Sequence, residues 1–152
     1  MRLTGNAVVG QSGGCTPVIN NSLAGVIEAA GKYDCIENLY GLWNGVVGLL
    51  NEDFTNLMRQ DKDTLEALQY TPSAALGSCR YKMSNEDDSR ALRIFEKNNI
   101  RYMFLIGGND SAETVLKLHE TAERAKYPLR IIGIPKTIDN DLSFIQKSFG
   151  FE

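Results

Sequence analysis

The sequence predicts an α/β fold in which a parallel sheet is covered by helices on both faces. Short apolar runs alternate along the chain with longer stretches in which apolar residues recur every three or four positions. That alternation is typical of strands followed by amphipathic helices. The runs at residues 7–10, 102–106 and 130–134 are apolar almost throughout instead of alternating with polar residues. Strands of this kind are typical of parallel sheets that are buried on both faces.

The first third of the chain predicts a strand, a helix and a second strand. The strand at 7–10 leads into a glycine-containing loop at 11–17, in which Pro17 stands where the first turn of a helix accepts proline. Apolar residues at helical spacing then predict a helix over 18–31, ending near a glycine. The next apolar run predicts a strand over 36–42.

The middle of the chain is less regular. Three glycines three or four positions apart predict that residues 43–50 form a loop with apolar anchors. A short helix is expected over 61–69, with Asp61 or Asp63 as its N-cap. A charged amphipathic helix is expected over 85–98, and three of its apolar side chains are expected to point inward, namely Leu92, Ile94 and Phe95.

The last third predicts a strand at 102–106 and a helix over 111–125. Asp110 and Glu113 stand three positions apart, which is the spacing of a capping pair. One face of this helix is expected to be apolar and packed, and it includes a packed histidine; its members are Ala112, Val115, Leu116, His119 and Ala122.

Four loops follow strands or strand-like segments, at residues 10–17, 77–80, 107–111 and 135–141. Because the carboxyl ends of parallel strands meet at one edge of a sheet, we expect these loops to gather there and form a binding site. Glycine pairs in the first and third loops would let backbone N–H groups approach phosphate oxygens. A tight strand-to-helix turn alone also needs glycine, so both interpretations of the glycines stay open.

The fourth loop is more informative. Asp139 and Asp141 lie just beyond Lys136 and Thr137. Phosphoryl transfer needs a base for a hydroxyl and positive charge for the phosphate, and this cluster offers both. A surface Asx turn is the simpler alternative, whereas a calcium loop is discounted because Phe144 stands where such loops need glycine. Neither a P-loop nor a GxGxxG motif is present.

Composition narrows the class of protein. The chain has 152 residues, a net charge of −3 and three widely spaced cysteines without a CxxC pair. A chain of this length usually forms one domain. The acidic balance argues against nucleic-acid binding and against anionic membranes, and the cysteines indicate a cytoplasmic protein rather than a disulfide scaffold.

Three segments, at residues 13–20, 107–111 and 135–141, closely resemble motifs of the 6-phosphofructokinase family in the family's order. The most specific is the Pro-Lys-Thr-Ile-Asp-Asn-Asp string of the third segment. The resemblance implies the N-terminal part of the phosphofructokinase fold, with a Rossmann-like parallel sheet between helices. It also implies transfer of a phosphoryl group to the 1-hydroxyl of fructose 6-phosphate.

The resemblance assigns roles to residues of this chain. Asp139 would be the base, with Lys136 and Asp110 as further catalytic residues. The residues that would bind the sugar are Thr137, Ile138 and Asp141. Those that would bind the phosphoryl donor are Gly13, Gly14, Arg80, Gly107, Gly108 and Ser111.

The same resemblance favours pyrophosphate over ATP as the donor. Asp110 stands where ATP-using members typically have glycine, and a carboxylate there would repel the α-phosphate of ATP. Lys136 would hold the pyrophosphate. Mg²⁺ is the implied cofactor, with Asn109 at the position of a metal ligand that is aspartate in many relatives. Cys15 lies in the first glycine loop and is expected to be buried and inert.

The implied activity is therefore that of a reversible, glycolytic diphosphate–fructose-6-phosphate 1-phosphotransferase. Family members are much longer than this chain, so residues 1–152 are expected to be the N-terminal donor-binding domain of a longer, truncated protein that forms homo-oligomers. The fragment alone is expected to be inactive. An ATP-dependent 6-phosphofructokinase and a non-catalytic phosphate-binding module are the alternatives.

Overall fold

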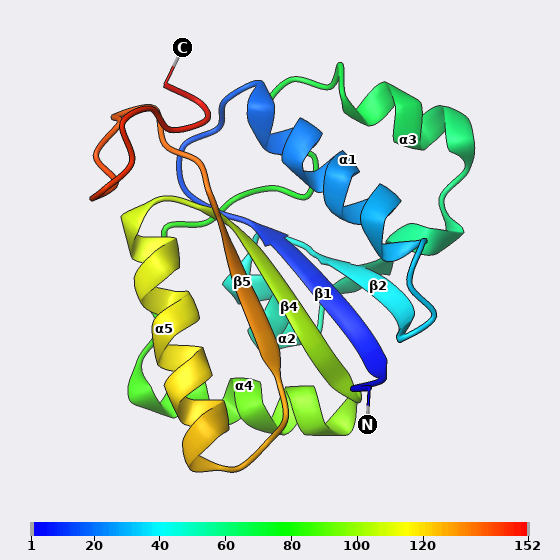
Figure 1. Cartoon of the computed structure of the whole chain (residues 1–152), viewed down its shortest axis with the longest axis vertical. Helices are drawn as coiled ribbons and strands as arrows, with labels where there is room; N and C mark the ends of the chain where they lie inside the picture. Colours follow the sequence, from blue (N-terminus) through cyan, green and yellow to red (C-terminus); the bar gives the residue numbers. More distant parts are fainter. Residues whose placement is uncertain (1, 152) are drawn as a thin grey trace.

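A computed structural model describes residues 2–151, which form one five-stranded sheet between two layers of helices (Figure 1). The elements follow in the order β1 (Gly5–Gln11), α1 (Val18–Ala30), β2 (Ile36–Leu42), α2 (Val46–Asn51), β3 (Phe54–Asn56), the 3₁₀ helix η1 (Leu57–Arg59), α3 (Lys62–Leu68), α4 (Asn85–Lys97), β4 (Ile100–Gly107), α5 (Asn109–Arg124) and β5 (Arg130–Pro135). The predicted α/β class is confirmed.

The strand order β3-β2-β1-β4-β5 places β1 at the centre of the sheet. β1 pairs in parallel with β2 and β4, and β4 pairs in parallel with β5. The short strand β3 was not predicted, and it pairs antiparallel with β2 at one edge. After β1 the chain passes to α1 on one face, and after β4 it passes to α5 on the other (Figure 1). A crevice where neighbouring strands lead to opposite faces is the usual ligand site of such sheets.

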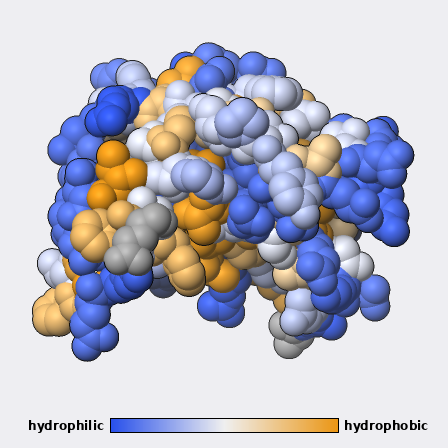
Figure 2. Space-filling model, turned by 90° about the horizontal axis from the view of Figure 1, so that it is seen from above, coloured by the Kyte–Doolittle hydropathy of each residue, from blue (hydrophilic) through white to orange (hydrophobic). Residues whose placement is uncertain are grey.

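Hydrophobic side chains are exposed beside the carboxyl end of the sheet. Figure 2 views this end from above and shows hydrophobic surface between larger hydrophilic areas. Among the exposed residues of the segment after β5 are Ile138 and Phe149, with 53% and 67% of their surface exposed. Apolar surface of this kind is typical of regions that contact further protein.

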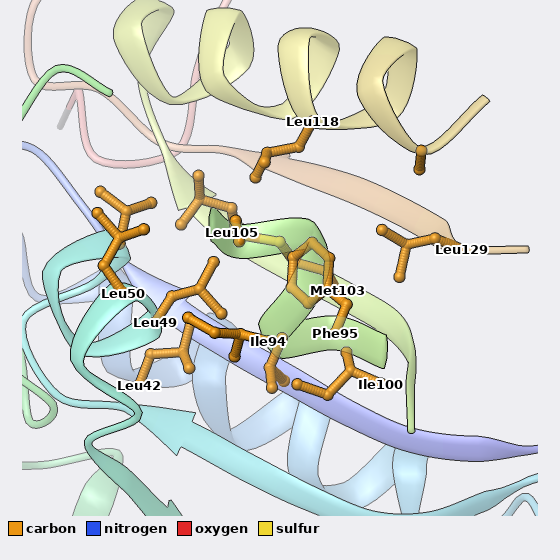
Figure 3. Packing of buried hydrophobic residues seen from close by; sticks show 14 of the residues in the cluster. Leu42, Leu49, Leu50, Ile94, Phe95, Ile100, Met103, Leu105, Leu118 and Leu129 are labelled. Carbon is orange, nitrogen blue, oxygen red and sulfur yellow. The ribbon is translucent and has the colours of Figure 1, made fainter. Parts of the chain in front are cut away.

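Two hydrophobic cores fill the space between the sheet and its helices. Figure 3 shows the core under α4 and α5, in which Phe95 lies among side chains from β4 and the neighbouring helices. The second core lies under α1 and contains Ile19 and Leu23. Along β1 the side chains alternate between the two, with Val8 in the first core and Ala7 and Val9 in the second. This alternation explains why the strand is apolar at every position.

Residues 43–50 were expected to form a loop, and this prediction is wrong because α2 occupies most of the segment. Val46, Leu49 and Leu50 are buried on one face of that helix, which is enough to hold a short helix against the core. Gly48 lies so close to the backbone of Trp43 that a β-carbon would stand 2.0 Å from its carbonyl oxygen. That glycine is therefore a packing requirement and does not break the helix.

Helix α5 differs from the prediction in its capping and its buried face. Its N-cap is Gly108, and no side chain caps it, so the predicted Asp110–Glu113 capping pair is absent from the described chain. The buried face contains Ser111, Leu118 and Ala122, whereas three residues of the predicted face are exposed, namely Ala112, Leu116 and His119. Because the buried face includes a serine, the pattern of apolar residues alone did not predict it.

Two further helices agree with the sequence. Asp61 caps α3 by accepting a hydrogen bond from the backbone N–H of Thr64 at 2.8 Å. Ser84 and Asp87 form a capping box at the start of α4, where Ile94 and Phe95 point into the core as predicted. Within residues 2–151, every helix is too short or too polar to cross a lipid bilayer.

Candidate active site

A cavity of about 310 Å³ lies where β1, β4 and β5 end. Every predicted site residue except one lines it; these are Gly13, Gly14, Arg80, Gly108, Asn109, Asp110, Ser111, Lys136, Thr137, Ile138, Asp139 and Asp141. The exception, Gly107, lies behind the lining, where a β-carbon would meet Ser111 Oγ at 2.0 Å. Gly107 therefore provides the space that lets Ser111 pack in the first turn of α5.

The loop after β1 forms one wall of the cavity. Gly13 has a φ of +74°, a conformation that L side chains rarely adopt. Its carbonyl oxygen accepts a hydrogen bond from Ser78 Oγ at 2.7 Å, which joins this loop to the turn that carries Arg80. Within the described residues the backbone N–H groups of Gly13 and Gly14 have no acceptor. This wall therefore offers unpaired donors to an anion.

Lys136 brings a positive charge into the same wall. Its side chain is 1% exposed, and its ammonium donates a hydrogen bond to the carbonyl oxygen of Gly14. Burial lowers the pKa of Lys136, a nearby Cys15 thiol raises it in part, and Arg80 lowers it further. Within residues 2–151 this ammonium forms no ion pair. A buried cation without a counter-ion is a strong receptor for an anion.

Asp141 is held in place by two side chains. Thr137 Oγ1 donates to one of its carboxylate oxygens at 3.0 Å, and Asn109 Nδ2 donates to the other at 2.7 Å. The segment after β5 is therefore joined to the first residue of α5. Asp139 is different, because its side chain is exposed and makes no hydrogen bond within residues 2–151. The Asp141 carboxylate is thus held by two hydrogen bonds, whereas the Asp139 carboxylate is not held by any within residues 2–151.

Asn140 determines how the two aspartates are presented. It has a left-handed φ of 51°, which asparagine adopts more readily than most residues. Its side chain donates to the carbonyl oxygen of Gln146 at 3.0 Å and accepts from the backbone N–H of Ser148 at 2.8 Å. These bonds fix the turn between Asp139 and Asp141, so Asn140 is a positioning residue that sequence reasoning did not single out.

Gln11 and Asn20 form a buried polar network that was also missed. Gln11 donates to Asn20 Oδ1 at 2.9 Å and accepts from the backbone N–H of Leu76 at 2.9 Å. Asn20 donates to the carbonyl oxygens of Thr71 and Ser73 at 2.7 and 2.8 Å. The segment before Gly77 was expected to be strand-like and is not a strand. This network holds it instead, and a glutamine at the end of an apolar strand was the available signal.

The outer half of the cavity is charged. Glu113 of α5 contacts Lys117 Nζ at 3.0 Å and Lys82 Nζ at 3.3 Å. The hydrogen bonds from Lys117 and then Lys82 lower the pKa of Glu113, so its carboxylate stays ionised. None of these three residues was predicted to belong to the site. Cys15 was expected to be buried, but it is exposed.

The described residues supply oxygen ligands for a cation but no closed metal cage. Within residues 2–151 there is no group of three or more His, Cys, Asp and Glu side chains that could hold a metal. The amide nitrogen of Asn109 is bonded to Asp141, so its carbonyl oxygen is the atom that could bind a cation. Amide and carboxylate oxygens are ligands that Mg²⁺ accepts, together with the oxygens of a bound phosphate.

Comparisons with known proteins agree with this geometry. The chain is 43% identical to the pyrophosphate–fructose 6-phosphate 1-phosphotransferase of Halomonas elongata, over 96% of this chain and 36% of that protein. It matches the solved structures of pyrophosphate-dependent phosphofructokinases from Marinobacter aquaeolei and Nitrosospira multiformis, each with a TM-score of 0.91, at 42% and 44% identity. These matches cover 97% and 96% of this chain and 37% of each solved chain.

The chain thus spans little more than a third of the length of the relatives that it matches. Its residues 6–152 match the family model named Phosphofructokinase, which covers the glycine loop, the start of α5 and the segment after β5. These three parts of the chain line the cavity together with the segment that carries Arg80 and Lys82. The chain therefore belongs to the phosphofructokinase family.

Proposed function

We propose that residues 1–152 are the donor-binding part of a longer, pyrophosphate-dependent 6-phosphofructokinase. The reaction converts fructose 6-phosphate and pyrophosphate into fructose 1,6-bisphosphate and phosphate, and it is reversible. The observation that carries the proposal is the buried ammonium of Lys136, which has no ion-pair partner within residues 2–151 and lines one cavity with the glycine loop and Asp139. The names of the relatives support the same activity.

Pyrophosphate is bound by backbone N–H groups and by positively charged side chains together. The unpaired N–H groups of Gly13 and Gly14 and the N-terminus of α5 point positive dipole ends at its oxygens. Lys136 and Arg80 add two positive charges. Charge-assisted hydrogen bonds of this kind strengthen as negative charge develops on the leaving phosphate, so they lower the barrier as well as aiding binding.

Asp139 takes the proton of the 1-hydroxyl of the sugar. The freed oxygen attacks the nearer phosphorus atom of pyrophosphate, the bond from that phosphorus to the bridging oxygen breaks, and inorganic phosphate leaves with the bridging oxygen. Thr137 and Ile138 lie beside Asp139 and contact the reacting end of the sugar. Asp141 keeps Thr137 in position through their 3.0 Å hydrogen bond.

The donor follows from Asp110. This exposed carboxylate lines the cavity in the first turn of α5, where it would face the α-phosphate of a nucleoside triphosphate and repel it. An ATP-dependent enzyme is the second candidate, because the cavity of about 310 Å³ extends along α5 as far as Lys117. A binding module without catalysis would not need the free base Asp139.

Further parts of the proposal concern the whole protein. Asn109 would hold Mg²⁺ together with oxygens of the bound pyrophosphate, and the ion would neutralise phosphate charge there. The exposed apolar side chains after β5 pack against the remaining part of the chain, which supplies the other sugar ligands. The whole protein acts in the cytoplasm as a homo-oligomer.

The test of the proposed base is Asp139→Asn in the full-length protein. Asparagine has the same shape but cannot accept the proton, so turnover with pyrophosphate should fall by about 10³-fold or more while the thermal unfolding temperature stays unchanged. Ser143→Ala, in an exposed residue of the same segment outside the cavity lining, is the matched control. Near-normal turnover of Asp139→Asn would remove Asp139 from the mechanism.

A further inference from the structure

We propose that Glu113 is a second specificity-determining residue of the donor site, which excludes the nucleoside part of larger donors. This inference rests on the proposed function, because it concerns which donor reaches Lys136 and Asp139. Asp110 repels the α-phosphate of such a donor. Glu113 acts further out, through the two ion pairs that it forms with Lys82 and Lys117.

The cavity is lined by one stripe of α5. Its members are Asn109, Asp110, Glu113, Thr114 and Lys117, at positions that share a helix face. Because a helix rises 1.5 Å per residue, Glu113 lies about 6 Å beyond the start of α5 and Lys117 about 12 Å beyond it. The stripe therefore leads from the phosphate-binding end of the cavity to its outer mouth.

Glu113 joins the two walls of the outer half. Lys117 stands one turn further along α5, but Lys82 comes from the segment that precedes α4. The Glu113 carboxylate lies 3.0 Å from the first ammonium and 3.3 Å from the second, so it bridges α5 to the opposite wall. The hydrogen bonds from the two ammonium groups lower the pKa of Glu113, which favours the ionised carboxylate.

A donor longer than pyrophosphate must pass this bridge. Its third phosphate counted from the reacting end, which is the α-phosphate of ATP, would meet Asp110. A nucleoside attached to that phosphate would meet Glu113 and Lys82. Nucleosides bind in apolar or aromatic slots with a few polar groups, whereas here they would have to displace a charged pair. Pyrophosphate ends before the bridge and is not hindered by it.

The bridge is suited to mutation because it contributes little to folding. The side chains of Lys82, Lys117 and Glu113 are 71%, 36% and 44% exposed, and exposed ion pairs add at most about 1 kcal/mol to stability. A variant at Glu113 should therefore fold normally. Changes in its activity then report on the cavity and not on unfolding.

The experiment compares donors that differ by one group at a time. The full-length protein, Asp110→Gly, Glu113→Ala and the double variant are assayed with pyrophosphate, inorganic tripolyphosphate and ATP. Tripolyphosphate and ATP carry the same three phosphates, so the ratio of their kcat/KM values isolates the nucleoside. We expect Glu113→Ala to raise the ratio of ATP to tripolyphosphate by about fivefold or more, in the unmodified and in the Asp110→Gly backgrounds.

Glu28→Ala, on α1 and away from the cavity, is the matched control, since it breaks an exposed ion pair of 2.7 Å with Lys32. It should leave the ratio unchanged. The inference is overturned if Glu113→Ala changes the ratio of ATP to tripolyphosphate kcat/KM by less than about fivefold in both the unmodified and the Asp110→Gly protein. Absence of turnover with pyrophosphate in the unmodified protein would instead overturn the proposed function, so the two failures are distinguishable.

Discussion

The ammonium of Lys136 donates a hydrogen bond to the carbonyl oxygen of Gly14, across 122 residues of chain. This bond joins the segment after β5 to the loop after β1, while the backbone N–H of Lys136 donates to Gly107 at the end of β4 at 2.9 Å. One residue therefore ties together the carboxyl ends of three strands. Its charge is placed where an anion bound by the glycine loop must lie.

We predict that Lys136→Met weakens the use of pyrophosphate without destabilising the fold. Burial lowers the pKa of Lys136, so the folded protein binds this proton less tightly than the unfolded chain does. The charge therefore costs stability below the lowered pKa, and the cost disappears as pH rises toward the ordinary lysine value of about 10.4. At pH 7 the variant should have an equal or higher free energy of unfolding. Its kcat/KM for pyrophosphate should fall by about 10²-fold.

Chemical denaturation at pH 7 and pH 10 together with steady-state kinetics checks this prediction. Lys32→Met, in an exposed lysine just after α1, is the control and should leave kcat/KM unchanged. A variant at Lys136 that binds pyrophosphate normally would show that the ammonium does not hold the donor.

Gly13→Ala should disturb the site through backbone strain. The left-handed φ of Gly13 costs a residue with a side chain about 1–2 kcal/mol. The new methyl group would also stand 3.4 Å from Lys136 Nζ, so the KM for pyrophosphate should rise. Gly25→Ala is the matched control, because a β-carbon there meets nothing within 4 Å and lies inside α1. That control should stabilise the protein by about 0.5–1 kcal/mol and leave the KM unchanged.

Asn140 should affect turnover more than folding. Asn140→Ala removes the two side-chain bonds to Gln146 and Ser148 and disfavours the left-handed φ, so Asp139 would lose its orientation. We expect kcat to fall by about 10²-fold with a smaller change in KM. Asn140→Gly allows the same φ but lacks the bonds, and it should recover only part of the activity. Full activity of Asn140→Ala would show that the turn needs no such support.

The charge of Asp88 should cost stability at neutral pH, and this single contribution should be recovered at acid pH. This carboxylate of α4 is 6% exposed, one of its oxygens has no partner within the described chain, and burial raises its pKa. The folded protein therefore binds the proton more tightly than the unfolded chain. The stability that this proton provides is present below the unfolded pKa and is lost as pH rises through the raised one. Asp88→Asn should raise the free energy of unfolding at pH 7 by about 1 kcal/mol.

Denaturant titrations of Asp88→Asn and the unmodified protein at pH 4 and pH 7 test this prediction. The difference between the two should shrink toward pH 4, where the native carboxyl becomes protonated. Asp63→Asn, at an exposed position of α3, should change stability little at either pH. A destabilised Asp88→Asn at pH 7 would mean that Lys117 and Arg124 compensate the buried charge.

The sequence predicted the parallel strands and the site loops because each depends on local patterns. The strand at Ile36–Leu42 and the helix at Val18–Ala30 follow apolar periodicity directly. The loops gather because strand ends share an edge, which is a property of the topology and not of any distant contact. The motif after the last strand therefore predicts Asp139 and Lys136 in one site.

The remaining features depend on contacts that no local pattern reveals. Gly48 indicates a loop in the sequence, but in the structure it is needed because the backbone of Trp43 packs against it. Ser111 hides the buried face of α5 because a polar residue packs against a glycine. The bridge from Glu113 to Lys82 joins segments 31 residues apart in the chain, so the outer half of the cavity could not be predicted from the motifs.

The central claim is that this site transfers a phosphoryl group from pyrophosphate. The most direct test is the steady-state rate of fructose 1,6-bisphosphate formation by the unmodified full-length protein, with Mg²⁺ and fructose 6-phosphate, and with pyrophosphate or ATP as the donor. We predict a kcat/KM for pyrophosphate at least about 10²-fold above that for ATP. Turnover with ATP that equals or exceeds turnover with pyrophosphate would contradict the account.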